Sequence, residues 1–334
     1  MAMTDHPRIA KPRIVVTAKL LDSVEARMAE LFDVRFNSDD HAFSRDELAE
    51  AMADCDVLVP TVSDRIDADL LKGAPDRLKM IANFGAGVDH IDLAAAQARR
   101  ITVTNTPGVF TEDTADMTLA LILSVPRRLN EGEKLVRSGA WNGWRPSGML
   151  GHRVGGKTLG IIGFGRIGEA VARRARAFGL NILYNKRRRL PPMLEEELGV
   201  TYEPDLDRLV ARSDIVSLHA PLTEETRGLI DAGRLSAMKP NAYLINTSRG
   251  ELVDENALIE ALETGRIGGA GLDVYTHEPA VDGRLLALDN VVLLPHLGSA
   301  TFEGREASGE RVIANIRIWA DGHRPPDQVL TGLA

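Results

Sequence analysis

The stretch Thr158-Leu-Gly-Ile-Ile-Gly-Phe-Gly-Arg-Ile-Gly168 lies near the middle of this 334-residue chain and decides how the region around it folds. An apolar run leads into the pattern Gly163-x-Gly165-x-x-Gly168, and apolar residues at helical spacing follow it. Gly163 permits a tight turn, Gly165 lets a pyrophosphate approach the backbone, and Gly168 lets the helix pack closely on its strand. The helix N-terminus offers N–H groups and a positive dipole end to phosphates. A strand before the glycines and a helix after them favour a dinucleotide-binding turn over an ordinary Gly-rich turn.

The next predicted strand, residues 181–184, ends in side chains that indicate which dinucleotide binds. NAD-binding folds usually carry Asp or Glu about 20 residues past the first glycine, where it binds the ribose 2′-hydroxyl. Asn185 occupies that place here, and the basic run of residues 186–189 follows it. Guanidinium groups suit a 2′-phosphate, whereas a carboxylate would repel it. A solvated basic loop and a nucleic-acid patch are alternatives, but the position relative to the glycines favours NADP(H), with NAD(H) possible.

Length, composition and charge limit the class of protein. A chain of 334 residues is expected to form two domains, because single domains usually hold ~100–200 residues. Its 44% hydrophobic and 26% charged residues are typical of globular proteins. The net charge of −8 argues against a nucleic-acid partner, since the basic run is local and no basic face accompanies it.

Cysteine content and apolar runs indicate the compartment. The one cysteine, Cys55, excludes an intramolecular disulfide framework and fits a reducing cytosol. The longest apolar run, residues 119–125, is far shorter than the ~20 residues that a membrane span requires. The first seven residues lack the apolar core of a signal peptide. We therefore expect a cytoplasmic protein with no membrane partner, and the absence of clustered His, Cys or Glu at ligand spacing predicts no metal site.

Strands and helices alternate in two parts of the chain, which predicts two doubly wound parallel sheets. Strands are expected at residues 13–17, 32–36, 57–59, 80–83 and 101–104, and again at 159–162, 181–184, 215–218, 242–245, 269–272 and 291–294. A final helix, residues 304–319, follows the last strand and is expected to cross back onto the first domain. The predicted boundaries are residues 1–105 with 303–334 for the first domain and 106–302 for the second.

The segment between the two series predicts an assembly. A long apolar helix over residues 111–123 leads into an irregular stretch that contains Trp141 and Trp144, and the whole arm spans about residues 111–155. A helix this apolar is not expected to face solvent, and aromatic anchors are enriched at protein interfaces. The simplest closed solution is a two-fold dimer in which each arm wraps its partner. We therefore expect a homodimer.

Three predicted strands of the second domain are followed by side chains capable of catalysis. Arg249, Glu278 and His296 each come after a different strand. In an open α/β sheet the ligand crevice lies outside the carboxyl ends of the strands, so all three are expected at the rim where the cofactor sits. Each residue has a structural alternative: a surface arginine, a turn acid before proline, and a satisfied histidine. Their joint occurrence on one rim favours a catalytic site.

These motifs resemble the D-isomer-specific 2-hydroxyacid dehydrogenase family over nearly the whole chain. The segments that carry the resemblance are residues 83–92 (NFGAGVDHID), 104–108 (TNTPG), the glycine pattern, 246–250 (NTSRG), Glu278-Pro279 and 295–300 (PHLGSA). Within the family, the chain is similar to the glyoxylate/hydroxypyruvate reductases, because of Gly139-Ala-Trp-Asn-Gly-Trp144 and the acid-free second strand end. The resemblance implies a flavodoxin-like substrate domain and a Rossmann dinucleotide-binding domain, with the active-site cleft between them.

The resemblance also implies a role for each catalytic residue. His296 would be the general acid–base, Glu278 its orienting carboxylate and Arg249 the clamp on the substrate. Reducing a 2-oxo acid requires a hydride at the carbonyl carbon and a proton for the developing alkoxide. Histidine can supply that proton near neutral pH, and a nearby carboxylate favours the protonated ring. A guanidinium can bind the substrate carboxylate and polarise the carbonyl together.

Further binding residues follow from the glycine pattern, the basic run and the resemblance. Asp273 is expected to bond the nicotinamide carboxamide, and Trp144 to reach toward the neighbouring subunit's substrate site. The predicted substrate-binding residues are Ala86 and Gly87, through their backbone N–H groups, with Trp144, Arg249 and His296. The predicted cofactor-binding residues are Gly163, Gly165, Arg166, Ile167, Gly168, Asn185, Lys186, Arg187, Arg188, Pro221, Thr247, Asp273 and Gly298.

The leading hypothesis is an NADPH-preferring reductase that converts glyoxylate to glycolate and hydroxypyruvate to D-glycerate. Reduction of 2-ketogluconate, or another D-2-hydroxyacid dehydrogenase activity, is an alternative on the same residues. Formate dehydrogenases are disfavoured, because they carry Gln where Glu278 stands. A nucleotide-sensing scaffold is a rival of a different class, since some members of the family are scaffolds; the intact Arg249, Glu278 and His296 set argues against it.

Overall fold

The computed structural model describes residues 11–330 and divides into two compact units. Unit 1 contains the chain up to Phe110 together with the segment from Thr301, and unit 2 is Thr111–Ala300. The N-terminal stretch on which the signal-peptide expectation rests lies outside the described residues. Among the described residues, no helix combines the length and apolarity needed to cross a membrane.

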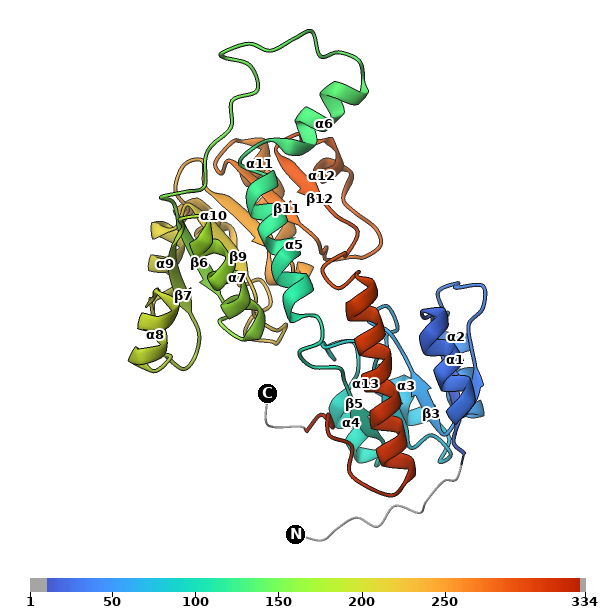
Figure 1. Ribbon diagram of the computed structural model, residues 1–334. Helices are drawn as coiled ribbons and strands as arrows, with labels where there is room; N and C mark the ends of the chain where they lie inside the picture. The colour runs from blue at the N-terminus through green and yellow to red at the C-terminus, as the bar shows by residue number, and fades with distance from the viewer. Residues whose placement is uncertain (1–10, 331–334) are drawn as a thin grey trace. The chain divides into compact units, whose positions relative to one another are not determined.

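Unit 1 is built on a five-stranded parallel sheet in the order β2-β1-β3-β4-β5. Figure 1 labels β3 and β5 of this sheet. Its strands are β1 (Arg13–Val16), β2 (Asp33–Arg35), β3 (Val57–Val59), β4 (Met80–Ala82) and β5 (Thr102–Thr104). Its helices are α1 (Asp22–Leu31), α2 (Arg45–Asp54), α3 (Ala68–Gly73), α4 (Leu93–Ala98) and α13 (Phe302–Ala320). The parallel sheet agrees with the alternating pattern, and its strand order is the flavodoxin-like order that the family resemblance implies.

The core of unit 1 lies on both faces of this sheet. Within β1, Ile14 and Val16 join the cluster formed with α1 and α13, while Val15 joins the cluster formed with α2, α3 and α4. Strands buried on both faces read as continuous apolar runs, and β1 does. Helix α13 packs beside α1, where a Cβ on Gly309 would lie 2.4 Å from the Val24 side chain, so only glycine permits this approach.

Unit 2 is built on a seven-stranded parallel sheet in the order β12-β11-β10-β9-β6-β7-β8. Its strands are β6 (Thr158–Ile162), β7 (Asn181–Asn185), β8 (Val200–Tyr202), β9 (Ile215–Leu218), β10 (Tyr243–Asn246), β11 (Gly269–Leu272) and β12 (Val291–Leu293). Its helices are α5 (Thr111–Ser124), α6 (Leu129–Arg137), α7 (Arg166–Ala177), α8 (Pro192–Leu198), α9 (Leu206–Arg212), α10 (Ala232–Ala237), α11 (Glu255–Glu263) and α12 (Gly283–Ala287), with a 3₁₀ turn at Gly250–Leu252. Strand β6 pairs with β7 on one side and β9 on the other, which makes this the switch point where a Rossmann sheet binds its ligand.

The two parallel sheets confirm the predicted fold class, but several short elements were not predicted. Strand β8 has three residues, of which only Val200 is buried, so neither alternation nor an apolar run marks it. Helices α3, α8, α10 and α12 have five to seven residues, which is about one and a half to two turns. Elements of this length carry too few apolar positions to show a helical period.

The surroundings of helix α5 overturn one reason for expecting a dimer, namely that so apolar a helix needs cover from a second subunit. Its apolar residues Ala115, Leu119, Leu121 and Ile122 are buried against the sheet and α7 of the same unit. Glycines in β11 permit the close packing, because a Cβ on Gly271 would lie 3.0 Å from the Cβ of Leu121. The apolarity of this helix is therefore satisfied inside unit 2 and does not require a second subunit.

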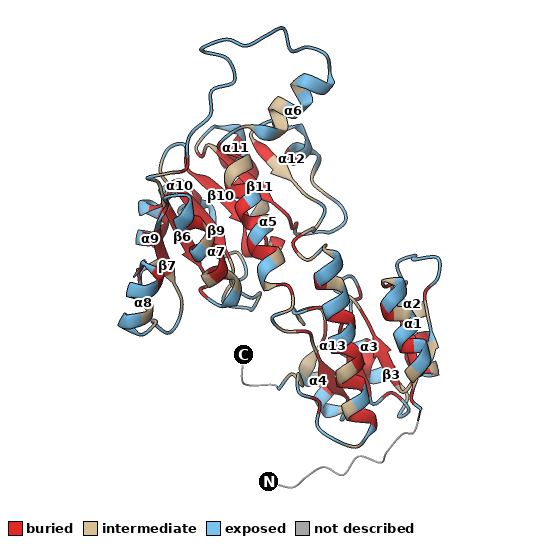
Figure 2. Ribbon diagram, viewed as in Figure 1, coloured by how far each residue is buried: buried red, intermediate tan, exposed pale blue. Residues whose placement is uncertain are grey.

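The arm that follows α5 differs sharply from it. Helix α6 has no buried residue, and the chain from its end to β6 is irregular, as predicted (Figure 2). Trp141 and Trp144 are 57% and 82% exposed, and Leu129 and Val136 are also exposed. Within the described chain, this arm therefore presents large apolar side chains without cover.

Candidate active site

The turn between β6 and α7 has the backbone conformation that its glycines require. Gly163 has φ +88°, and a Cβ there would lie 2.5 Å from the backbone of His219 and Ala220. A Cβ on Gly168 would lie 2.4 Å from the carbonyl oxygen of Gly163. Both positions therefore exclude any other residue. They bring the β6 turn against the residues that follow β9, at the switch point of the sheet.

The N-terminus of α7 fits a pyrophosphate. Gly165 is the N-cap residue, and no side chain caps the first turn of the helix. Nothing lies within 4 Å of the place where a Cβ of Gly165 would stand, so the backbone is open to a ligand. Arg166 is exposed and Ile167 is half-buried at the start of the helix. Uncapped N–H groups and the helix dipole together make an anion site.

The arginines in the loop after β7 differ in whether they are bonded within the protein. Arg189 donates two hydrogen bonds to the carboxylate of Glu195, at 2.9 and 2.7 Å. These bonds and a third from the Tyr184 hydroxyl lower the pKa of Glu195 to about 2. Arg187 and Arg188 are exposed, and within the described chain they form no ion pair. Arg189 is thus a structural residue, while Arg187 and Arg188 are available to a ligand.

Two side chains at the ends of β7 and β10 shape the loops that follow. The side-chain amide of Asn185 donates to the carbonyl oxygens of Glu203 and Pro204, which holds the β7 loop beside β8. Asn246, at the end of β10, donates to the carbonyl oxygen of Arg249 at 2.8 Å and accepts from the N–H of Ser248 at 3.0 Å. The side chain of Asn246 was not predicted to act here, although its place at a strand end is visible in the sequence.

Arg249 is placed by the glycine that follows it. A Cβ on Gly250 would lie 2.0 Å from the backbone carbon of Tyr275, so the segment carrying Arg249 packs directly on the segment that leads to Glu278. Arg249 is half-buried and donates to the carbonyl oxygen of Ser248 at 2.8 Å. Its charge also acts on Glu278, where it lowers the carboxyl pKa.

Glu278 and His296 form a hydrogen-bonded pair. Nδ1 of His296 lies 2.8 Å from Oε2 of Glu278, and Oε1 accepts from the N–H of Tyr275 at 3.0 Å. Burial raises the pKa of Glu278. The hydrogen bond from His296, the positive charge of that ring, the hydrogen bond from the Tyr275 N–H and the charge of Arg249 together outweigh burial, so the pKa lies below its usual value. Both side chains remain about one-third exposed, so the pair is accessible to a ligand.

The turn that carries His296 is held by Asp273. His296 has φ +55°, a left-handed conformation that is uncommon for a residue with a side chain. Its N–H donates to the carbonyl oxygen of Asp273 at 3.0 Å. The N–H groups of Leu297 and Gly298 donate to the Asp273 carboxylate at 2.6 and 2.7 Å. Burial raises the pKa of this carboxyl despite those bonds. This supporting role of Asp273 was not predicted, because a left-handed turn at a histidine leaves no sequence signal.

The remaining predicted cofactor residues lie at the same edge of the sheet. The hydroxyl of Thr247 is buried and lies 2.9 Å from that of Thr118 on α5, while Pro221 is exposed after β9. His219 lies beside the Gly163 turn, with Nε2 2.8 Å from the Ser217 hydroxyl. Burial lowers the pKa of His219 to about 3, so its ring is neutral at physiological pH.

Ala86 and Gly87 belong to unit 1, in the glycine turn that follows β4. Ala86 is exposed and Gly87 is half-buried, and no backbone hydrogen bond within the described chain uses their N–H groups. Trp144, the remaining predicted substrate residue, lies on the exposed arm of unit 2. The structure therefore brings Arg249, Glu278 and His296 together within one unit and places the other predicted substrate residues on separate segments.

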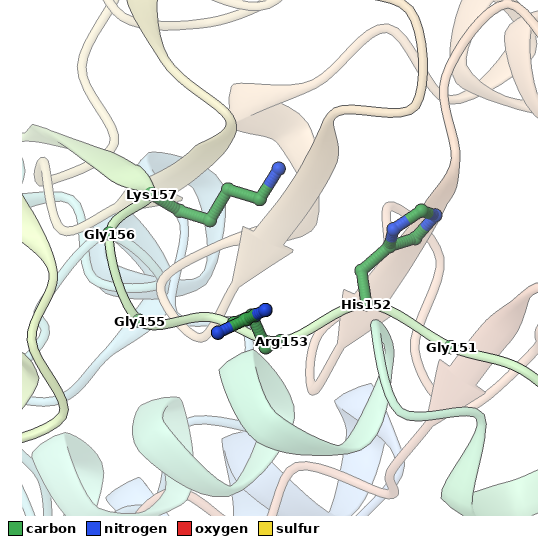
Figure 3. A pocket seen from close by; sticks show the side chains of 6 residues that line it. All are labelled: Gly151, His152, Arg153, Gly155, Gly156 and Lys157. Atoms are coloured by element: carbon green, nitrogen blue, oxygen red, sulfur yellow. The ribbon is translucent and has the colours of Figure 1, made fainter.

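A hollow of about 410 Å³ lies where the arm joins β6, lined by Gly151, His152, Arg153, Gly155, Gly156 and Lys157 (Figure 3). It lies at the amino end of β6, whereas the glycine turn follows the carboxyl end. It is therefore separate from the dinucleotide turn. Among residues 11–330, no group of three or more His, Cys, Asp or Glu side chains is placed to hold a metal ion.

Comparisons with known proteins agree with this geometry. Residues 119–298 match the model of the D-isomer specific 2-hydroxyacid dehydrogenase NAD-binding domain. The glyoxylate reductase of Thermococcus onnurineus is 47% identical over 323 residues, which cover 96% of each chain. The glyoxylate reductase of Thermococcus litoralis is also 47% identical, over 96% of this chain and 97% of that protein.

A solved structure is similar as well. The NADPH-dependent glyoxylate/hydroxypyruvate reductase of Sinorhizobium meliloti, in complex with NADP and malonate, superposes with a TM-score of 0.85 at 37% identity, covering 96% of this chain and 97% of that one. The family match, the full-length relatives and the two parallel sheets agree with one another. The chain belongs to the D-isomer specific 2-hydroxyacid dehydrogenase family and is an NAD(P)-dependent oxidoreductase.

Proposed function

We propose that this protein is an NADPH-preferring reductase of small 2-oxo acids, which converts glyoxylate to glycolate and hydroxypyruvate to D-glycerate. The observation that supports it most is the His296–Glu278 pair beside Arg249, on the rim of the sheet that carries the dinucleotide turn. Relatives of nearly the same length are glyoxylate reductases, and a similar structure is a glyoxylate/hydroxypyruvate reductase with NADP.

The catalytic roles follow from how the three side chains are held. A bound nicotinamide dinucleotide supplies the hydride. Glu278 accepts a hydrogen bond from Nδ1–H of His296, so Nε2 is the ring nitrogen that holds the proton for the substrate carbonyl oxygen. Glu278 fixes the tautomer and the ring orientation. Arg249 binds the substrate carboxylate and polarises the carbonyl, since a planar guanidinium can donate to both. In this proposal the N–H groups of Ala86 and Gly87 bind the carboxylate from the substrate domain.

The dinucleotide would be held by residues of unit 2. The uncapped turn at Gly165, Arg166 and Ile167 would bind the pyrophosphate. Asp273, Thr247, Pro221 and Gly298 would border the nicotinamide; both carboxylate oxygens of Asp273 already accept backbone N–H groups, so its contact with the carboxamide would be additional.

Preference for NADPH would come from the loop after β7. Exposed Arg187 and Arg188, together with Lys186, can bind a 2′-phosphate with charge-assisted hydrogen bonds. The usual acid is absent, since Asn185 occupies that place and its amide is bonded to backbone carbonyls. Glu195, the nearest acid downstream, is neutralised by Arg189 and does not oppose a phosphate.

The proposed assembly is a homodimer that covers the exposed arm. Trp141 and Trp144 are exposed large apolar side chains, and aromatic side chains of this kind are typical interface anchors. Trp144 would then lie near the partner's substrate site. In this proposal unit 1 is the substrate domain and unit 2 the dinucleotide domain.

Initial rates test the proposed function. Purified protein should reduce glyoxylate and hydroxypyruvate faster with NADPH than with NADH, and pyruvate and 2-ketogluconate more slowly. Faster turnover of 2-ketogluconate would reassign the substrate to longer sugar acids. Dinucleotide binding without turnover of any of the four acids would indicate a scaffold and would contradict the proposal.

A further inference from the structure

The glycine turn after β4 is held by side-chain amides at three consecutive carbonyls. Asn83 donates through Nδ2 to the carbonyl oxygens of Gly85 and Gly87, at 3.0 and 2.8 Å. Asn105, after β5, donates to the carbonyl oxygen of Ala86 at 2.7 Å. The N–H of Thr106 adds a second bond to Gly85, at 3.0 Å. Every carbonyl of the turn is therefore occupied.

Holding a carbonyl also fixes the N–H of the next residue. The peptide unit is planar and almost always trans, so the C=O of one residue and the N–H of the following residue point in opposite directions. The bonds to Gly85, Ala86 and Gly87 thus fix the N–H groups of Ala86, Gly87 and Val88. No hydrogen bond within the described chain uses those three N–H groups. Successive unpaired N–H groups in a turn can bind an anion.

The orientation of the Asn83 amide is itself determined. Asn83 is fully buried, and both hydrogens of Nδ2 are used by the turn. Its Oδ1 lies 3.0 Å from Nε2 of His90, which must be the donor because an amide oxygen only accepts. A flipped Asn83 would place an oxygen against two carbonyl oxygens and leave His90 facing an NH₂ group. His90 therefore prevents the amide from turning over.

We infer that Asn83 and Asn105 are positioning residues, which hold the N–H groups of Ala86, Gly87 and Val88 ready for the carboxylate of the substrate. The inference rests on the proposed function, in which this turn binds that carboxylate. Neither asparagine touches the substrate. Their side chains replace the secondary structure that would otherwise hold the peptide planes, and the site needs no rearrangement when the anion arrives.

The experiment compares glyoxylate with its uncharged ethyl ester in the variants Asn83→Ala and Asn105→Ala. Both compounds present the same aldehyde to hydride transfer, but only glyoxylate carries the anion. We expect kcat/KM for glyoxylate to fall about tenfold or more in Asn83→Ala, mainly through KM, because the N–H groups lose the orientation in which they donate to the carboxylate. We expect a smaller fall in Asn105→Ala, which releases one carbonyl. The ester should keep its kcat/KM in both variants.

Asn37→Ala is the matched control. Asn37 is also buried in unit 1 and also bridges two carbonyl oxygens through Nδ2, those of Thr17 and His41, at 2.8 and 2.7 Å. It should lose comparable stability without changing the preference for glyoxylate over the ester. Asn83→Asp should be worse than Asn83→Ala, because a carboxylate cannot donate to the turn and repels an anion.

Three outcomes would overturn the inference. Unchanged kcat/KM for both glyoxylate and the ester in Asn105→Ala, the milder variant, and in Asn83→Ala would remove both residues from this role. A parallel loss for the acid and the ester would assign them to general stability. Wild-type protein that reduces neither compound would contradict the proposed function itself, and the inference with it.

Discussion

The rim of unit 2 and the exposed segments of the same unit differ in how their side chains are held. On the rim, His296 is fixed through its ring by Glu278 and through its backbone by Asp273, and the loop of Arg249 is held by Asn246. In the β7 loop and the arm, by contrast, Arg187, Arg188 and Trp144 point to solvent, and within the described chain no hydrogen bond holds their side chains.

This difference indicates which step each region serves. Proton and hydride transfer require reacting atoms within a narrow range of geometry, so residues that act in them need support from neighbours. Cofactor choice and subunit contact rest on charge and apolar area, which tolerate mobility until the ligand or partner arrives. Substitutions on the rim are therefore expected to change kcat, and substitutions on the exposed segments to change binding.

The largest effect is expected at His296. Replacement by Ala removes the proton donor and should lower kcat for glyoxylate reduction by ~10²–10⁴-fold, while binding of NADPH survives. Steady-state rates with a fluorescence titration of NADPH measure both quantities. His277→Ala is the matched control, because this neighbouring histidine is exposed, and it should retain wild-type kcat. Near-normal kcat in His296→Ala would remove the residue from its role.

The second-largest loss of activity is expected for Arg249→Lys. The substitution keeps the charge but loses the planar fork, so we expect kcat/KM for glyoxylate to fall about tenfold to a hundredfold. The dissociation constant of NADPH should stay within a factor of about two, since the cofactor is held elsewhere. A lysine variant with wild-type kcat and KM would show that Arg249 does not clamp the substrate.

The exposed arginines should affect one cofactor only. Arg187→Ala with Arg188→Ala should weaken NADPH about tenfold or more, because charge-assisted bonds to the 2′-phosphate are lost, and should leave NADH nearly unchanged. KM values for both dinucleotides measure this. Arg27→Ala, an exposed arginine of unit 1, should change neither. Equal losses for NADPH and NADH would mean that the loop does not read the 2′-phosphate.

A smaller effect is expected in how the stability of the fold depends on pH through the Glu278–His296 pair. The pKa of Glu278 lies below its usual value, so its charge stabilises the fold above the ordinary glutamate pKa of about 4.3, and that contribution is lost as pH falls through the lowered pKa. Thermal unfolding of wild type and Glu278→Gln should therefore differ at pH 7 and converge as the pH falls below the ordinary glutamate pKa. A difference that grows on acidification would contradict the shift.

Trp144→Ala should have the smallest effect. We expect the variant to stay dimeric and to show a changed KM for glyoxylate, because the tryptophan is proposed to border the partner's site. Light scattering and initial rates check the two parts separately. A fully active monomer would contradict the dimer, whereas unchanged kinetics in a dimer would contradict only the contribution of Trp144 to the site.

The dinucleotide turn and the two sheets could be predicted from the sequence, whereas some short elements could not. At Gly163 and Gly168 the backbone leaves no room for a side chain, so glycine is required at both positions and is visible in the sequence. The dinucleotide turn was therefore predictable. Alternating strands and helices were likewise enough for the two parallel sheets, because continuous apolar runs mark strands such as β1 and β6. Strand β8 was not predictable, since three edge residues carry no period.

Support around the site could not be predicted in the same way. The left-handed turn at His296, held by the Asp273 carboxylate, depends on residues 23 positions apart and leaves no local pattern. The apolarity of α5 was visible, but whether its own sheet or another subunit covers it is a tertiary question. Arg187 and Arg189 look alike in the sequence; only the position of Glu195 separates them.

The most direct test is the single-turnover rate of glyoxylate reduction at saturating NADPH, measured for wild type, His296→Ala and the Arg187→Ala/Arg188→Ala double variant. We predict a rate reduced by ~10²–10⁴-fold in His296→Ala and a wild-type rate in the double variant, because saturation removes its binding defect. A double variant as slow as His296→Ala, or a His296→Ala variant as fast as wild type, would contradict the division between a supported catalytic rim and exposed binding segments.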